Sequence, residues 1–331
     1  MHARRATYLL ALVLAAGCDG PSGPDVDTGF GSIRSSKWSA MVTEVTRRDW
    51  MPKRGGAELV TAHYRIFATT TNPVLRRYLP GFMEASYRDY LRLTQLPERA
   101  GAERMPIYMM STYKEWAALT RHAVGTDVPI QAGGYTYKGT CVFWDIGTPH
   151  TFAVARHEGL HQFFHHNLQD RLPMWLEEGT CVLAEGMELE GDSVRFTPAR
   201  NPVRFNSLRK TIVQNHWIPL TKLLPLHSME ATGGFPERAH AYYSQLWALV
   251  LYIHSRDDYR AGMQRLLADA RAGRLHEVLQ MPREELARLR RSARTYNRRI
   301  STHLFRHYIT RDVEVFEKRF KAFARRLVEL E

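Results

Sequence analysis

Residues 152–164 have the sequence FAVARHEGLHQFF. The five residues HEGLH at 157–161 decide which fold and which kind of site we expect. In a helix, positions i and i+4 lie on one face, so His157 and His161 can bind one metal ion. Glu158 lies beside them, where a carboxylate can act as a general base toward water. The apolar residues around the motif have the spacing of a buried helix: Phe152, Val154, Leu160, Phe163 and Phe164. Buried imidazoles and carboxylates are costly without a partner, so the stretch predicts a metal-binding helix.

Catalytic zinc needs a third protein ligand and one open position. The extended metzincin pattern requires Gly and His where this chain has Phe164 and Asn167, so that class is excluded. Residues 172–179 read LPMWLEEG, in which Pro173 suits the first turn of a second helix. The interval from His161 to Glu178 is enough for a helix end, a turn and a returning helix. A carboxylate there can face the two imidazoles, and Glu177 is the alternative ligand.

HExxH followed by WLxEG resembles the gluzincin zinc metallopeptidases. The combination is most similar to secreted bacterial proteins of the peptidase MA-like type, which add a downstream Tyr-x-Gln-x-Trp helix. Here that helix begins with YSQLW at 243–247, and the resemblance covers roughly residues 57–255. It implies hydrolysis of peptide bonds, with His157, His161 and Glu178 as zinc ligands and Glu158 as general base. Glu178 is preferred to Glu177 because the family's ligand directly precedes the Gly.

The resemblance also implies a hydrogen-bond donor for the oxyanion that develops during amide hydrolysis. Tyr243 matches the family's donor, while Tyr242 and His240 are rivals. A Tyr at the start of an apolar helix is also consistent with simple packing.

Related enzymes orient a ligand His with an Asp four residues after the third ligand. Val182 stands there, so the resemblance leaves Thr180 or Glu185 as substitutes.

The segment Gly133–Trp144 directly precedes the metal-binding helix. By resemblance it is the edge strand that pairs with a bound peptide backbone, which makes Gly133, Gly134 and Tyr135 candidate substrate-binding residues. An ordinary hairpin with a glycine bulge is the alternative.

Two features near the motif have structural interpretations. Cys141 and Cys181 form either a disulfide after export or two buried free thiols. His165 and His166 end the motif helix, where the helix dipole favours imidazoles, so we interpret them as structural.

The wider pattern predicts an α+β fold, with a β-rich N-terminal part, a zincin-like helical core and additional C-terminal helices. Strands are expected over 59–69 and 105–110, with a hairpin over 134–145. Helices are expected over 72–94, 114–122, 151–167, 173–185, 204–214, 239–255, 259–272 and 311–330. We expect a catalytic domain over 39–256, and a basic helical extension over 257–331 that packs on it.

The 331 residues carry a formal net charge of +12 and an ordinary globular composition, which excludes collagen-like and wholly disordered chains. Three cysteines exclude a disulfide-framework protein and a four-cysteine zinc module. The Arg-rich segment 283–299 contains no nucleic-acid recognition motif. We therefore interpret it as a solvated or lipid-facing surface.

The N-terminus is typical of an exported lipoprotein. Residues 1–17 combine a basic start with an apolar run too short to span a bilayer, as in a signal peptide. The ending LAAGC at 14–18 resembles a bacterial lipobox, with Cys18 as the lipidated residue. Residues 18–38, rich in Gly, Pro, Ser and Asp up to Ser32, are expected to be a flexible tether. The protein would then be anchored by lipid on the periplasmic side of the cell envelope.

These predictions leave two possible functions, one enzymatic and one not. The first is a zinc-dependent hydrolase of peptide bonds, tethered at the cell envelope, which takes peptide or protein substrates. The second is a catalytically silent zinc-binding lipoprotein that acts as a binding module or scaffold. A silent protein has no need of Glu158, so the sequence favours the hydrolase.

Replacing Cys18 by Ser should release the protein from the membrane fraction. Acyl chains contribute about 0.8 kcal/mol per buried methylene, whereas attraction of the basic surface to anionic lipid is weakened by salt. Membrane association of wild type and the Cys18→Ser variant should be compared after a high-salt wash. Unchanged association of the variant after that wash contradicts a lipid anchor at Cys18.

Overall fold

A computed structural model describes residues 33–34, 46–49, 56–99, 101–125, 133–190, 193–233 and 235–330. The predicted signal peptide, Cys18 and most of the predicted tether lie outside these residues. One piece of the tether, β1 (Ile33–Arg34), pairs antiparallel with β9 (Ser193–Phe196), and β8 (Met187–Glu190) completes a three-stranded sheet.

A six-stranded mixed sheet forms the N-terminal part, with the order β2-β3-β4-β5-β7-β6. Its strands are β2 (Thr46–Asp49), β3 (Ala57–Val60), β4 (Tyr64–Ala68), β5 (Met105–Met110), β6 (Gly134–Tyr137) and β7 (Thr140–Trp144). The central pairs β4–β5 and β5–β7 are parallel, and the outer pairs are antiparallel. Ile66, Ile107 and Cys141 lie in register across the centre. Within the described residues, β6 is therefore an edge strand.

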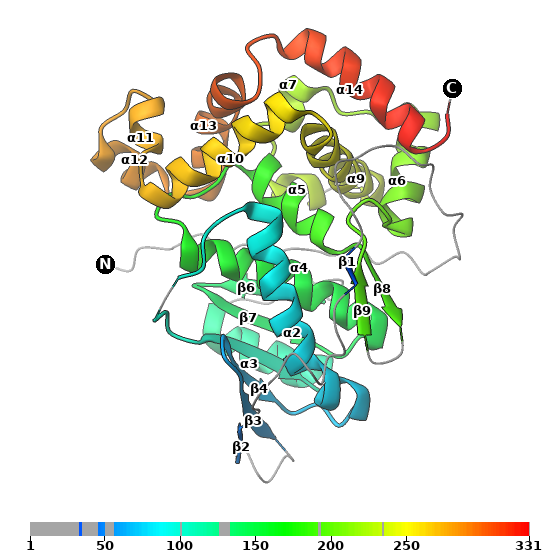
Figure 1. Ribbon diagram of the computed structural model, residues 1–331, viewed down its shortest axis with the longest axis vertical. Helices are drawn as coiled ribbons and strands as arrows, with labels where there is room; N and C mark the ends of the chain where they lie inside the picture. Colours follow the sequence, from blue (N-terminus) through cyan, green and yellow to red (C-terminus); the bar gives the residue numbers. More distant parts are fainter. Residues whose placement is uncertain are drawn as a thin grey trace.

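Helices cover both faces of this sheet. α2 (Pro73–Thr94) and α4 (Thr148–Asn167) lie on one face and contact each other (Figure 1). α3 (Tyr113–Val124) covers the other face, where Trp116 packs against Tyr135 and Val142. The α+β class predicted from the sequence is confirmed.

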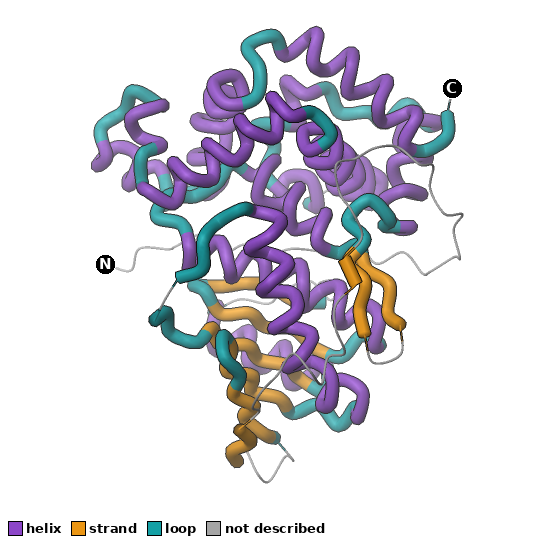
Figure 2. The backbone as a smooth tube through the Cα atoms, viewed as in Figure 1, coloured by secondary structure: helices purple, strands orange, loops and turns teal. Residues whose placement is uncertain are grey.

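The C-terminal half is a helical layer above the sheet (Figure 2). It contains α5 (Met174–Ala184), α6 (Pro202–Val213), α7 (Leu220–Leu223), α8 (Ser228–Thr232), α9 (Pro236–His254), α10 (Asp257–Ala272), α11 (Leu275–Val278), α12 (Arg283–Leu289), α13 (Ala293–Tyr308) and α14 (Val313–Leu327). Helix α9 is buried along most of its length and packs against α5 and α6. The apolar run LWALVLYI in α9 thus forms the centre of this layer.

The prediction of one strand over 59–69 is wrong, because a turn divides the segment into β3 and β4. Thr61 donates from its backbone N–H to the Tyr64 carbonyl at 3.0 Å. The Thr61 hydroxyl and the His63 backbone N–H both donate to the buried Glu84 carboxylate of α2, at 2.6 and 2.9 Å. Side-chain anchoring from a distant helix decides this turn, and the local pattern of β-forming residues does not report it.

Close packing at Gly159 fixes the position of the motif helix α4. A Cβ there would lie 2.7 Å from the Tyr90 hydroxyl and 2.9 Å from the Met83 methyl group, so only Gly lets α2 approach. The Tyr90 hydroxyl then donates to the Arg156 carbonyl at 2.6 Å. Arg156 itself is fully buried and pairs with Asp89 of α2. Arg156 and Gly159, on either side of His157, thus connect the HEGLH motif to α2.

Helix α14, near the C-terminus, packs on α9. Phe316, Phe320 and Phe323 of α14 are buried and surround Tyr252 of α9. The sequence did not predict α13, whose apolar residues Tyr296 and Ile300 are interrupted by arginines. Among the described helices, none combines the length and hydropathy needed to cross a bilayer.

Replacing Phe316 by Ala should destabilise the domain by about 3–5 kcal/mol, because it empties a closed aromatic site. The Phe316 ring lies 5.1 Å, centroid to centroid, from the rings of Tyr252, Tyr259 and Phe305. Val315 on the same helix is 45% exposed, so Val315→Ala is the matched control and should cost about 0.5 kcal/mol or less. Urea unfolding of the soluble domain measures both values. Equal effects of the two substitutions would show that α14 does not pack as described.

Candidate metal centre

Helices α4 and α5 bring two imidazoles and a carboxylate together. The Nε2 atoms of His157 and His161 lie 3.6 and 3.5 Å from the same oxygen, Oε2 of Glu178. Two ligands of a tetrahedral ion with bonds of about 2.0–2.1 Å lie about 3.3–3.4 Å apart. Each of the two Nε2 atoms is therefore about as far from this carboxylate oxygen as two ligands of one metal ion are from each other.

The electrostatics of these side chains also suit a cation. Glu178 is fully buried, and neither of its carboxylate oxygens makes a hydrogen bond within the described part of the chain. Burial favours its neutral form, but His157 and His161 outweigh burial and hold the pKa of Glu178 well below its usual range. Burial disfavours charge on His157 as well, yet Glu178 and Glu185 raise its pKa. The centre thus favours positive charge at the point where the three side chains meet.

Two further carboxylates contact the imidazoles at Nδ1, the ring nitrogen that does not face Glu178. Nδ1 of His157 lies 2.9 Å from Glu185, and Nδ1 of His161 lies 3.0 Å from Glu177. A carboxylate bond at Nδ1 fixes the ring so that Nε2 faces the ligand position. The structure therefore distinguishes the two adjacent acids, because Glu178 faces both Nε2 atoms and Glu177 supports His161 from the other side.

Glu185 is in turn held by Arg204, whose guanidinium donates two hydrogen bonds of 2.9 Å to the two carboxylate oxygens. Burial would raise the pKa of Glu185, but Arg204 and His157 lower it to about 2. Between the two substitutes left open by the sequence, Glu185 contacts the ligand His. The Thr180 hydroxyl instead donates to the Leu176 carbonyl within its own helix.

Glu158 lies one residue from the first ligand and is almost fully buried. The Thr136 hydroxyl of β6 lies 2.9 Å from Oε2 and 2.8 Å from the backbone carbonyl oxygen of Glu158, so these two acceptors share its one proton. Oε1 of Glu158 makes no hydrogen bond to a described residue. Burial raises the pKa of Glu158, although the nearby imidazoles oppose the shift. A buried carboxylate with one free oxygen and a raised pKa suits proton transfer.

Tyr243 of α9 is buried, and its hydroxyl has no hydrogen-bond partner among the described residues. Burial and the Glu178 carboxylate raise the pKa of Tyr243 well above its usual range, so the phenol keeps its proton. The rivals are engaged elsewhere. The Tyr242 hydroxyl donates to the Leu226 carbonyl at 3.4 Å, and Nδ1 of His240 lies 3.5 Å from the Ser207 hydroxyl.

Gly179, the last residue of the WLxEG pattern, explains how Tyr243 comes near the centre. A Cβ at Gly179 would lie 2.6 Å from a Val250 methyl group and 3.1 Å from the Leu246 carbonyl oxygen of α9. Only Gly allows α5 and α9 to approach so closely. The glycine therefore serves helix packing directly beside the Glu178 carboxylate.

Gly133 and Gly134 lie at the start of β6, beside α4. A Cβ at either position would lie within 2.9 Å of a Val154 methyl group, so the glycines let the edge strand lie against the motif helix. The Tyr135 side chain points to the other face of the sheet and packs against Trp116. Its backbone, and not its ring, is therefore the part that could meet a peptide.

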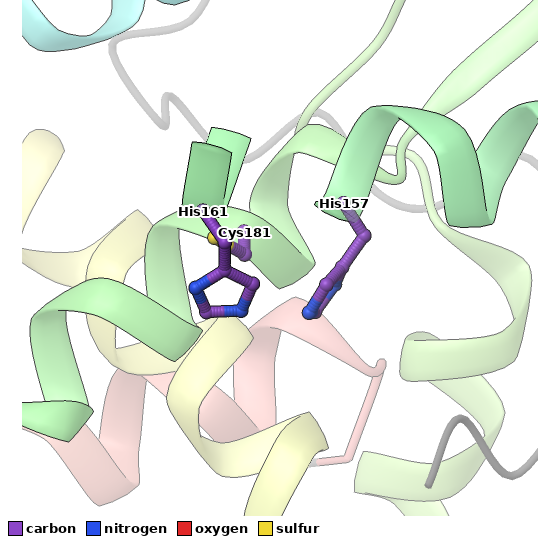
Figure 3. Close-up of side chains that lie close together, drawn as sticks. All are labelled: His157, His161 and Cys181. Carbon is purple, nitrogen blue, oxygen red and sulfur yellow. The ribbon is translucent and has the colours of Figure 1, made fainter. Parts of the chain in front are cut away.

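Cys181 also lies near the two histidines. One ligand atom each from His157, His161 and Cys181 lie within 4.8 Å of one another (Figure 3). Burial raises the pKa of the Cys181 thiol to about 12, so it does not ionise readily. Cys181 is a second candidate for the third position, whereas the Oε2 atom of Glu178 lies 3.6 and 3.5 Å from the Nε2 atoms of His157 and His161. Cys141 and Cys181 are both buried free thiols, so the disulfide alternative is not realised.

The sequence analysis missed several contacts of this centre: those of Thr136, Glu177 and Arg204 described above, and the nearby His227. Burial lowers the pKa of His227, and the charge of Glu178 opposes that shift. His166, interpreted from the sequence as structural, donates from Nε2 to the Gly139 carbonyl at 3.0 Å.

Neither the protein-family models nor the curated proteins contain a match to this sequence. The case for a function therefore depends on the geometry of this centre.

Proposed function

We propose that the protein is a zinc-dependent hydrolase of peptide bonds. The observation that carries the proposal is the approach of the His157 and His161 Nε2 atoms to one carboxylate oxygen of Glu178, with the buried Glu158 carboxylate near both imidazoles. Two imidazoles and one carboxylate are a ligand set typical of catalytic zinc, which keeps a fourth position open. The resemblance of HEGLH and WLEEG to gluzincin motifs supports the same function.

In this proposal His157, His161 and Glu178 hold the zinc. When bound, zinc supplies a Lewis acid that polarises the substrate carbonyl and makes water more acidic. Glu158 takes a proton from the attacking water and delivers it to the leaving amine, while Thr136 holds its other oxygen. The neutral Tyr243 hydroxyl donates a hydrogen bond to the developing oxyanion.

The substrate backbone would lie along β6. This strand has an unpaired edge among the described residues, and its Thr136 contacts the general base. A peptide that adds to such an edge gains main-chain hydrogen bonds and is held extended. The edge would therefore bring a peptide alongside Glu158.

The same proposal places the enzyme at the bacterial cell envelope, anchored through lipid on Cys18. The motif LAAGC and the Gly- and Pro-rich segment after it support this location. Residues 251–331 carry a net charge of +8, which would add attraction to anionic lipid.

A catalytically silent zinc-binding scaffold is the second candidate. The observation that favours it is the burial of the ligands, none of which is more than 4% exposed, because structural zinc sites are closed. A purely structural site does not require a carboxylate such as Glu158. One oxygen of Glu158, Oε1, makes no hydrogen bond to a described residue. Turnover decides between the two candidates.

The first prediction from this centre concerns metal content. Gently purified wild type should contain one zinc per chain by elemental analysis, and His161→Ala and Glu178→Gln should each lose most of it. Loss of a ligand leaves the others buried and unpaired, so both variants should also unfold at lower temperature. His122→Ala, at an exposed position of α3, is the control and should keep the zinc. Wild type that neither contains zinc nor takes it up contradicts the proposal.

The second prediction separates Glu158 from the ligands. Glu158→Gln should keep zinc and fold, yet lose about two to four orders of magnitude in kcat, because only the proton transfer is removed. Turnover of a mixed peptide library, measured with zinc content on the same sample, tests it. Near wild-type turnover rules out Glu158 as the base, whereas loss of zinc shows that Glu158 is a ligand.

A further inference from the structure

A cavity of about 720 Å³ lies beside the candidate metal centre. Its walls come from the β6–β7 turn at 138–139, the end of α4 with the following residues up to 172, and residues 287–291 at the end of α12. Thr136, His161 and Glu177 also line it. The cavity lining therefore includes the proposed zinc ligand His161 and Thr136, whose hydroxyl contacts the Glu158 carboxylate.

Positive charge exceeds negative charge around this cavity. Four cationic side chains line it, namely Lys138, Arg171, Arg290 and Arg291, against the two carboxylates of Asp170 and Glu177. Both carboxylates are engaged. Asp170 pairs with Arg290 and accepts a hydrogen bond from the Leu275 backbone N–H, and Glu177 contacts Nδ1 of His161.

Lys138 and Arg291 have no carboxylate partner in the described part of the chain. Lys138 lies in the tight turn with a backbone φ of 50°, and its ammonium lies 4.9 Å from the centroid of the Tyr137 ring. Arg291 is exposed just beyond α12. These two cations, which come from different elements of the cavity lining, are thus available to an anionic ligand.

Four apolar side chains form part of the lining: Phe164, Leu168, Leu172 and Ala287. Such walls suit the methylene stem of a side chain, whereas the cations suit a carboxylate at its end. Lys138 and Arg291 are both exposed, so an ion pair that either forms with such a carboxylate is weak and sensitive to salt.

We propose that this cavity is a substrate subsite that binds a carboxylate-bearing residue of the peptide next to the bond that is cleaved. The inference rests on the proposed function and adds a substrate class to it. The carboxylate can come from an internal Glu or Asp side chain or from the C-terminus of the peptide, and the two sources share the same recognition chemistry.

The test uses peptides that differ by one group. Starting from a cleaved library peptide, Glu and Gln are compared at each position around the cleaved bond, and the C-terminal acid is compared with its amide. We expect kcat/KM to favour the carboxylate form by about two- to fivefold in one of these pairs, the effect of one exposed ion pair. The preference should fall as salt is raised. The pair that shows it identifies the source of the carboxylate.

Arg291→Glu should abolish or reverse this preference. Arg299→Glu makes the same charge change at an exposed position outside the cavity lining and should retain the preference. Zinc content of both variants confirms that the metal centre is intact. Equal kcat/KM for every carboxylate and neutral pair in wild type overturns the subsite, as does a preference that survives unchanged in Arg291→Glu.

A binding measurement keeps this test separate from the proposed function. Fluorescence anisotropy with zinc-loaded Glu158→Gln protein compares the Kd of labelled Glu and Gln peptides without hydrolysis. Tighter binding of the Glu peptide, lost in the Glu158→Gln, Arg291→Glu double variant, supports the subsite even if wild type cleaves no peptide. Cleavage by wild type with no discrimination in rate or binding overturns the subsite and leaves the proposed hydrolase standing.

Discussion

The structure depends on keeping ionisable side chains away from water where α4 meets α5. His157, His161, Glu158 and Glu178 are each at most 4% exposed, and several of their polar atoms make no hydrogen bond to described residues. Isolated charges are unstable in such surroundings, so the neighbouring elements must compensate them. Glu177 and Glu185 support the imidazoles, and Arg204 holds Glu185. A bound cation would complete this compensation.

The same requirement explains the glycines around the centre. Gly159 brings α2 against α4, and Gly179 brings α9 against α5. A Cβ at either position would hold the two helices further apart next to the motif residues. Close approach excludes water from the ligands and places the Tyr243 hydroxyl near Glu178. The packing and the chemistry of this protein are therefore set by the same short segments.

Sequence reasoning succeeded where the relation between residues is local. Two histidines four apart share a helix face whatever surrounds them, so HEGLH predicts its own geometry. Glu177 and Glu178, however, are neighbours about 100° apart on a helix, and only the rotation of α5 against α4 decides which faces the imidazoles. The choice of Glu185 over Thr180 likewise depends on a tertiary contact, that of Glu185 with Nδ1 of His157 in α4. The cavity was not predictable from the sequence. Lys138 and Arg291 are far apart in sequence, and only tertiary packing brings both into the lining of one cavity.

Glu158 bears most directly on what the centre is for. Its carboxylate is buried, its Oε1 makes no hydrogen bond to a described residue, and burial shifts its pKa toward the neutral form. A group in this condition destabilises the folded state relative to an apolar residue of the same volume. A centre built only to bind metal would be more stable without it. A group that must accept and release a proton beside the proposed metal ligands is expected to destabilise the fold locally. This destabilisation is the physical reason to prefer the hydrolase over the scaffold.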